Sequence, residues 1–200
     1  MANVAVVYYS STGNVYELAR AVVDGAESAG AEVRFRRARE LAPEEAIQSN
    51  EAWAKHVEET KDVPVAQSED LEWADAFAFG TPTRYGNVSA QLKQFIDAQG
   101  GLWAQGLLAD KAASVFTSAS TPHGGQEGTL LSMYAILAHW GSIIVPTGYT
   151  SDEINAIGNP YGVSSTDGGV TGNGGPSKEE LAAARYLGQR LARKAALLAA

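Results

Sequence analysis

The chain of 200 residues contains no cysteine, only three histidines and fewer basic than acidic residues. The missing cysteines exclude disulfides, thiolate nucleophiles, iron–sulfur clusters and Cys-ligated zinc, and so few histidines argue against any metal site. Fifteen Lys and Arg against 23 Asp and Glu give a formal net charge of −8. Nucleic acid is therefore not an expected partner, because affinity for a duplex comes mainly from basic side chains. Any redox chemistry must use a bound cofactor.

Long apolar runs and a basic N-terminal segment are also missing. No apolar stretch approaches the roughly 18 residues that span a bilayer, and residues 4–9 already look like a strand. We therefore expect a cytoplasmic protein without membrane insertion. With 45% hydrophobic residues, the chain can form a single domain over residues 1–200 with a sizeable core.

Apolar, β-rich runs alternate along the chain with segments of helical periodicity. Strands are predicted at 4–9, 32–36, 76–79, 112–117 and 143–145. Helices are predicted at 15–29, 88–98 and 129–140, and after the capping box of Ser177 and Glu180. This alternation predicts an α/β fold, a doubly wound parallel sheet of five strands with helices on both faces.

Two stretches do not fit this alternation. Residues 41–70 are charged and helix-prone around Glu44 to Thr60, and His56 within them is expected to be solvated. Residues 148–176 are rich in Gly, Ser, Thr and Asn with little periodicity, and a loop of that length is usually functional or disordered.

The loop after the first predicted strand is suited to a phosphate group. Residues 10–15, with the sequence SSTGNV, place hydroxyls, a glycine and an amide at the start of a helix, where free N–H groups and a partial positive charge attract anions. The loop has no lysine and matches neither GxxxxGK[ST] nor GxGxxG, which favours a phosphate monoester held without magnesium. Taken alone, the loop is better explained as an ordinary hydroxyl-rich turn with a helix N-cap, and only the neighbouring loops favour the phosphate.

The loops after the third and fourth predicted strands have a similar character. Residues 80–87, GTPTRYGN, combine a rigid turn with Arg84 and Tyr85, which could cover a flat heterocycle, although Arg84 could also be a plain surface charge. Residues 117–128 are small, hydroxylic and glycine-rich. Ligands of open parallel sheets bind at the carboxyl ends of the strands, so the convergence of three such loops favours a binding site there. Trp103 and His139 could each face a flat ligand or fill the core.

Taken together, these motifs resemble those of the flavodoxin-like WrbA-type NAD(P)H:quinone oxidoreductases, the family once called tryptophan-repressor-binding proteins. The resemblance covers essentially the whole chain, from YYSSTGN through GTPTRYGN, GGLWAQG and GGQEGT to LAHWG and NPYG. It implies a flavodoxin-like strand order of 2-1-3-4-5, FMN as cofactor and NADH or NADPH as electron donor. It also implies two-electron reduction of quinones by ping-pong hydride transfer through the flavin N5, in a homotetramer whose sites are completed by neighbouring subunits.

The resemblance further assigns roles to individual residues. Trp103 is implied to line the substrate pocket over the flavin, and His139 and Arg84 are the candidate catalytic residues, since either can donate a hydrogen bond to the flavin or to a quinone oxygen. The implied cofactor-binding residues are Ser10, Ser11, Thr12, Gly13, Asn14, Val15, Pro82, Thr83, Arg84, Tyr85, Gly86, Ser118, Ala119, Ser120, Thr121 and His139.

The chain departs from the family pattern at three places. Thr12 stands where the family often has an aromatic residue linked to nicotinamide-nucleotide binding, Pro122 and His123 interrupt a run usually made of glycine and threonine, and residues 41–70 match poorly. Two other functions stay open at this point: a flavodoxin-style one-electron carrier, and a scaffold that holds FMN without turnover.

Overall fold

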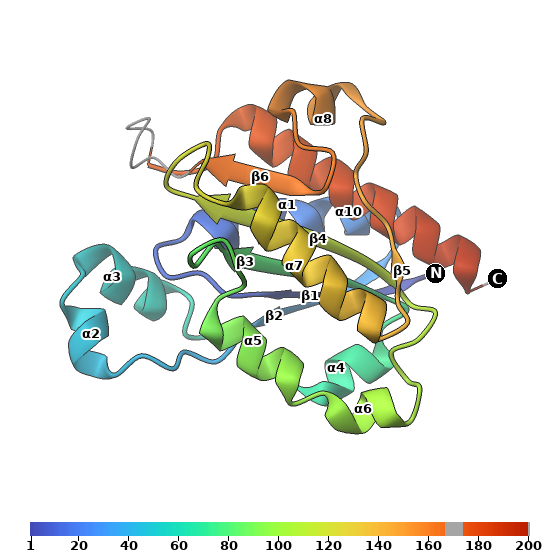
Figure 1. The fold of residues 1–200 in the computed structure, drawn as a ribbon, viewed down its shortest axis with the longest axis horizontal. Coiled ribbons are helices and arrows are strands. Elements are labelled where there is room, and N and C mark those ends of the chain that lie inside the picture. Colours follow the sequence, from blue (N-terminus) through green and yellow to red (C-terminus); the bar gives the residue numbers. More distant parts are fainter. Residues whose placement is uncertain (167–173, 200) are drawn as a thin grey trace.

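The computed structural model describes residues 1–166 and 174–199 and forms a twisted parallel sheet covered by helices (Figure 1). Its strands run in the order β2-β1-β3-β4-β5, and all the pairs are parallel. The predicted α/β fold and strand order are confirmed. The strands are β1 (Asn3–Tyr8), β2 (Glu32–Arg37), β3 (Ala76–Pro82), β4 (Ala112–Ala119), β5 (Ile143–Ile144) and β6 (Val163–Thr166).

The fifth position of the sheet is shared by two short strands, where the sequence predicted one. β5 pairs with Ala112 and Ala113 at the start of β4, and β6 pairs with Phe116–Ala119 at its end. Because β3 occupies the other edge of β4, both strands lie on the same side of it. The chain between them includes α8 (Asp152–Ile157), so part of the stretch predicted as a loop is regular structure. The rest of that prediction, at 167–173, lies outside the described residues.

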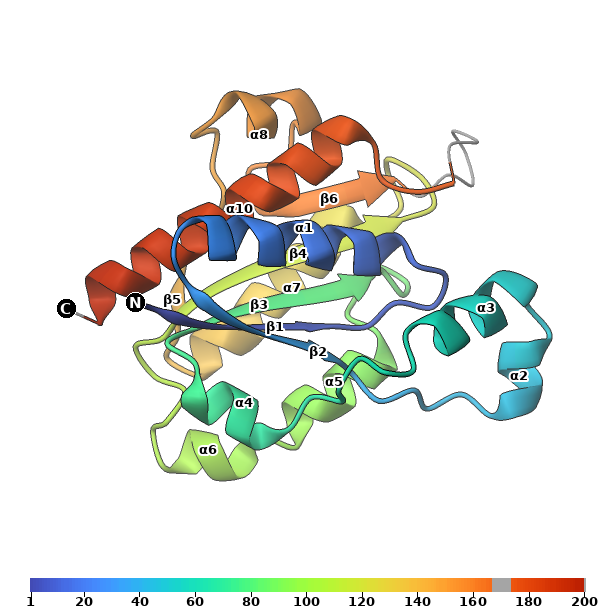
Figure 2. The same ribbon diagram turned by 180° about the vertical axis from the view of Figure 1, so that it is seen from behind.

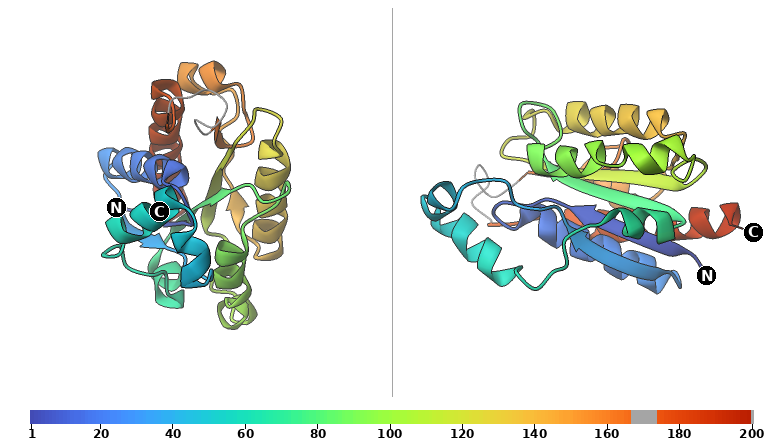
Figure 3. Two further views of the ribbon diagram at one scale, coloured as in Figure 1. Left: turned by 90° about the vertical axis from the view of Figure 1, so that its left-hand side faces the viewer. Right: turned by 90° about the horizontal axis from the view of Figure 1, so that it is seen from below.

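Helices cover both faces of the sheet (Figures 2 and 3). One face packs against α1 (Asn14–Ser28) and α10 (Lys178–Leu198), and the other against α4 (Ser68–Trp73), α5 (Ala90–Asp97) and α7 (Gln126–His139). Successive side chains of a strand point to opposite faces, so Val4 and Val6 join the first core whereas Ala5 and Val7 join the second. Both faces of the central strands are therefore buried, which explains their unbroken apolar sequences.

Three helices lie at the ends of the sheet. The helix-prone stretch predicted around 44–60 forms α2 (Glu44–Gln48) and α3 (Glu51–Glu59), which project beyond the carboxyl ends of the strands. The short helix α6 (Gly100–Ala104) lies at the opposite end of the molecule (Figure 1). In the described parts of the chain, no helix combines the length and the apolar character needed to cross a membrane.

Candidate functional site

The three loops singled out in the sequence meet at the carboxyl ends of β1, β3 and β4. They surround a small cavity of about 70 Å³ between the β1 loop and the two loops opposite it. Most of the residues that the resemblance assigned to a cofactor face it. The lining residues are Ser10, Ser11, Thr12, Asn14, Val15, Pro82, Thr83, Arg84, Ser118, Ala119 and Ser120.

Residues 10–15, which we call the cradle, turn sharply into α1. Gly13 is the N-cap and has a φ of 105°, in the left-handed region that favours glycine. Its backbone N–H donates to Ser10 Oγ at 3.1 Å, and no side chain caps the helix. The first turn of α1 therefore keeps backbone N–H groups free of intrahelical partners, together with the positive end of the helix dipole.

Asn14 provides the clearest sign that the cradle binds a ligand. The residue is only 8% exposed, and its Nδ2 atom has no hydrogen-bond partner among the described residues, while its Oδ1 accepts from Ser165 Oγ at 3.4 Å. A buried donor without a partner costs about 1–3 kcal/mol, and such groups are rare in proteins. A phosphate oxygen at the start of α1 would satisfy it, so the cradle fits the monoester that its sequence suggested.

The β3 loop presents Arg84 and Tyr85 at the rim of the cavity. The loop closes on itself, since Arg84 N donates to Asn87 O at 2.8 Å and Asn87 N donates back to Arg84 O at 3.1 Å. Arg84 Nη2 also donates to Ser11 Oγ at 3.3 Å, which joins this loop to the cradle. Tyr85 has a φ of 54°, and its side chain is fully exposed rather than directed into the cavity.

The β4 loop packs directly on the β3 loop. Thr129 Oγ1 donates to Thr83 Oγ1 at 2.7 Å, and a Cβ atom on Gly125 would lie 2.8 Å from Gly86 Cα. Gly125 also has a φ of 92°, so both this backbone conformation and the close approach to Gly86 require glycine at the start of α7. Ser118 and Ala119 are buried, whereas Ser120 and Thr121 are exposed at the mouth.

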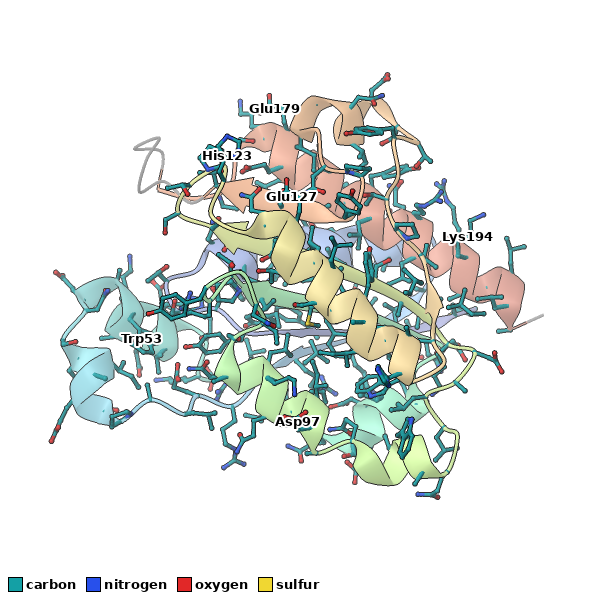
Figure 4. All side chains as sticks on the ribbon, viewed as in Figure 1. Trp53, Asp97, His123, Glu127, Glu179 and Lys194 are labelled. Carbon is teal, nitrogen blue, oxygen red and sulfur yellow. The ribbon has the colours of Figure 1, made fainter. Side chains whose placement is uncertain are left out.

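Trp103 and His139 lie next to each other, but within a single chain they are far from the cradle. His139 ends α7, about 15 Å along the helix from Thr129, which contacts the β3 loop. Trp103 in α6 donates through Nε1 to the His139 backbone oxygen at 3.0 Å. The two residues, here called the ledge, border a cavity of about 240 Å³ that Asp97 also lines. Figure 4 shows the separation of the two places: Asp97, which lines the ledge cavity, lies well apart from Trp53, which lies on α3 beyond the carboxyl ends of the strands.

Sequence reasoning missed a larger cavity of about 750 Å³ beside the cradle, between α1 and α3. The expectation that His56 is solvated was wrong: the residue is 6% exposed and lines this cavity. Its ring packs edge-on against Tyr16 of α1, with centroids 5.5 Å apart. The charged neighbours Glu58 and Lys61 that suggested a solvated residue face outward, and the helical period turns His56 toward α1. Burial lowers the pKa of His56, although the charge of Glu59 opposes this.

Glu40 fixes α3 in this position. Its half-buried carboxylate accepts from Tyr9 Oη at 2.9 Å, Trp53 Nε1 at 3.1 Å and Gln91 Nε2 at 2.9 Å, and from the backbone N–H groups of the two following residues. Burial by itself would raise the pKa of Glu40, but these donors together hold it below the usual value. Strand β1, helix α3 and helix α5 are thus joined at one carboxylate.

Within residues 1–166 and 174–199, no group of three or more His, Asp or Glu side chains is placed to hold a metal ion. The site has the features of a mononucleotide-binding α/β protein of the flavodoxin type, with an anion cradle at the first crossover of a 2-1-3-4-5 sheet. A family model described as NADPH-dependent FMN reductase matches residues 3–155, and the chain belongs to this family.

Relatives of this chain support the same assignment. A protein of Deinococcus radiodurans, named NAD(P)H dehydrogenase (quinone), is 47% identical over 88% of this chain and 86% of its own length. A protein of Sinorhizobium fredii with the same name is 46% identical over the full length of both chains. Among solved structures, a WrbA-like flavodoxin from Agrobacterium tumefaciens has a TM-score of 0.69 and 27% identity and covers 98% of this chain and 99% of its own. The WrbA-type resemblance of the motifs is thereby confirmed.

Proposed function

We propose that the protein is an FMN-dependent NAD(P)H:quinone oxidoreductase. The overall reaction is NAD(P)H + H⁺ + quinone → NAD(P)⁺ + hydroquinone, in which the nucleotide loses two electrons and the quinone gains them. The unpartnered Asn14 amide in a cradle at the start of α1 is the observation that carries the proposal, because it lacks an acceptor at a helix end that favours an anion. Relatives that share 46% or 47% of their residues with this chain are named for this reaction.

The residues present fit FMN. Residues 10–15 would hold its phosphate through hydroxyls and backbone N–H groups, and the loops at 82–86 and 118–121 would hold its ring. When bound, FMN supplies the redox chemistry, because it can accept two electrons from a nicotinamide nucleotide and pass them to a quinone. Arg84 supports this arrangement: its guanidinium bridges the first two loops and stays exposed enough to donate to a flavin or quinone oxygen.

The ledge can take part in the reaction only if it is placed at the flavin site of a second copy of the chain. Trp103 is 56% exposed, and its indole is fixed by the hydrogen bond to the His139 backbone. Placed over the flavin of a neighbouring subunit, it would close the pocket in which the nicotinamide and the quinone take turns, and His139 would donate to the ring or to the quinone. Such an arrangement is that of the homotetramer expected from the sequence, and two substrates that use one pocket imply a ping-pong order.

Reconstitution with FMN tests this function. We expect the purified chain to bind FMN, to oxidise NADH or NADPH with benzoquinone as acceptor, and to give parallel lines in initial-rate plots at several quinone concentrations. A protein that binds FMN yet shows no benzoquinone-dependent oxidation of either nucleotide would contradict the proposed enzyme. If reduction with limiting electrons then accumulated the one-electron form of the flavin, the carrier function would replace it.

A further inference from the structure

The large cavity beside the cradle exceeds what a mononucleotide phosphate alone requires. It has a volume of about 750 Å³ and lies between the first turn of α1 and α3. Thr12, Asn14 and Ser120 line both this cavity and the smaller one among the loops, so the two adjoin. A ligand in the cradle and a group in this cavity can therefore share the N-terminal end of α1.

His56 is a second polar side chain at this place, and no hydrogen bond to its ring is present among the described residues. The residue is only 6% exposed and lines the cavity, and its ring nitrogens are not among the fully buried atoms, so a ligand in the cavity can reach them. Its Nδ1 lies 3.6 Å from where a Cβ atom would stand on Gly13, the N-cap of α1. The edge-on contact with Tyr16 holds the ring, so its position does not depend on a ligand.

The charged residues around the cavity narrow the choice of ligand. Lys55 pairs with Glu59 at 3.7 Å and is largely exposed, so it is not the free donor of the site. Glu17 and Glu59 also line the cavity and repel any anion, so an anionic group fits best in the corner between His56 and the start of α1, where the helix N-terminus offsets this repulsion. Two neutral donors and a helix N-terminus in one corner suit a group with several acceptor oxygens in close proximity, as in a phosphate ester.

We infer that this cavity is a phosphoryl subsite in which the His56 imidazole and the Asn14 amide donate hydrogen bonds to one phosphate ester. The inference rests on the proposed function, which brings two such esters to the protein: the monoester of FMN and the diphosphate of the nicotinamide nucleotide. Neutral imidazole carries one N–H, so His56 can donate without being protonated. Helix α3, within residues 41–70, would then supply this contact.

Calorimetry on the whole chain with His56→Phe tests the subsite. Phenylalanine keeps a ring against Tyr16 and removes both nitrogens. If the monoester of FMN is the ligand, FMN binds about tenfold more weakly to the variant while riboflavin binding is unchanged. If the diphosphate is the ligand, ADP-ribose binds about tenfold more weakly to the FMN-loaded variant and the ratio of FMN to riboflavin affinity is unchanged. Lys61→Gln, which removes a cation from the same segment outside the cavity, should change none of these.

Unchanged affinity of the variant for FMN, riboflavin and ADP-ribose would overturn the subsite while leaving the proposed function intact. Wild-type protein that binds no flavin would instead contradict the proposed function itself. A second measurement does not depend on the folding of the variant. The imidazole ¹⁵N resonances of His56 in the wild-type protein should shift on addition of FMN or ADP-ribose but not of riboflavin, and their failure to move with any of these ligands would also overturn the inference.

Discussion

The two ends of the sheet differ in how completely a single chain builds them. At the carboxyl ends of the strands, three loops interlock through side-chain and backbone hydrogen bonds around a preformed cradle. At the opposite end, Trp103 and His139 form a ledge at which Trp103 is exposed, and this ledge borders a cavity of about 240 Å³. In the proposed function, one chain supplies the cofactor cradle and a second copy supplies the ledge, and the predictions below test this division.

The largest effect is expected at the cradle, from Asn14→Asp. The change removes the unpartnered donor and places a carboxylate beside the phosphate, so FMN should bind about 100-fold more weakly or worse. Isothermal titration measures this, with riboflavin as the control ligand, whose affinity should stay within about twofold. An unchanged FMN affinity would remove the cradle from the cofactor site.

A smaller effect, on turnover and not on cofactor affinity, is expected at the ledge from Trp103→Ala. Removing an aromatic anchor typically costs about 2 kcal/mol, so kcat/KM for benzoquinone should fall by about 30-fold while the FMN affinity is unchanged. Trp103→Phe should restore most of the activity, because it restores a flat face. Equal losses in cofactor affinity and in turnover would mean that the ledge acts on the fold and not on the substrate.

The sequence predicted the three loops at the carboxyl ends of the strands, but not the burial of His56 beside them or strand β6. Strand–loop–helix periodicity sufficed to find the three loops, since parallel strands bring their carboxyl ends together. The burial of His56 could not be predicted from the sequence, because it depends on the packing of α3 against α1 and not on the charged residues next to it in the chain. Strand β6 was missed for a similar reason: four residues without a clear alternation become a strand only because β4 offers them a free edge.

The position of α3 next to the cradle should depend on Glu40. Glu40→Gln replaces one acceptor oxygen by a donor facing other donors, and we expect the free energy of unfolding to fall by about 1–2 kcal/mol at pH 7. The folded state lowers the pKa of this carboxyl, so its stabilisation is present above the ordinary glutamate pKa of about 4.3 and is lost as the pH falls below it. Urea unfolding at several pH values should show the gap between the two proteins closing in acid. A constant gap would contradict this account.

The smallest effect concerns the ligand-free state of the large cavity. Burial lowers the pKa of His56 in the folded protein, so the unfolded chain binds its proton more readily and stability should decrease as the pH falls below about 6.5. His56→Phe should make the free energy of unfolding depend less on pH between about pH 7.5 and 5.5, because this is the range in which a free histidine titrates. Thermal unfolding without flavin measures this. A profile as steep in the variant as in the wild type would assign the dependence to other groups.

Subunit complementation tests most directly whether cradle and ledge are halves of one site. Asn14→Asp and Trp103→Ala chains with different affinity tags can be expressed together, and the mixed oligomers purified and assayed with NADH and benzoquinone in FMN. The account predicts that mixed oligomers are clearly more active than either parent variant, because the intact cradle of one chain meets the intact ledge of the other. Activity no higher than the average of the two parents would contradict a site shared between subunits.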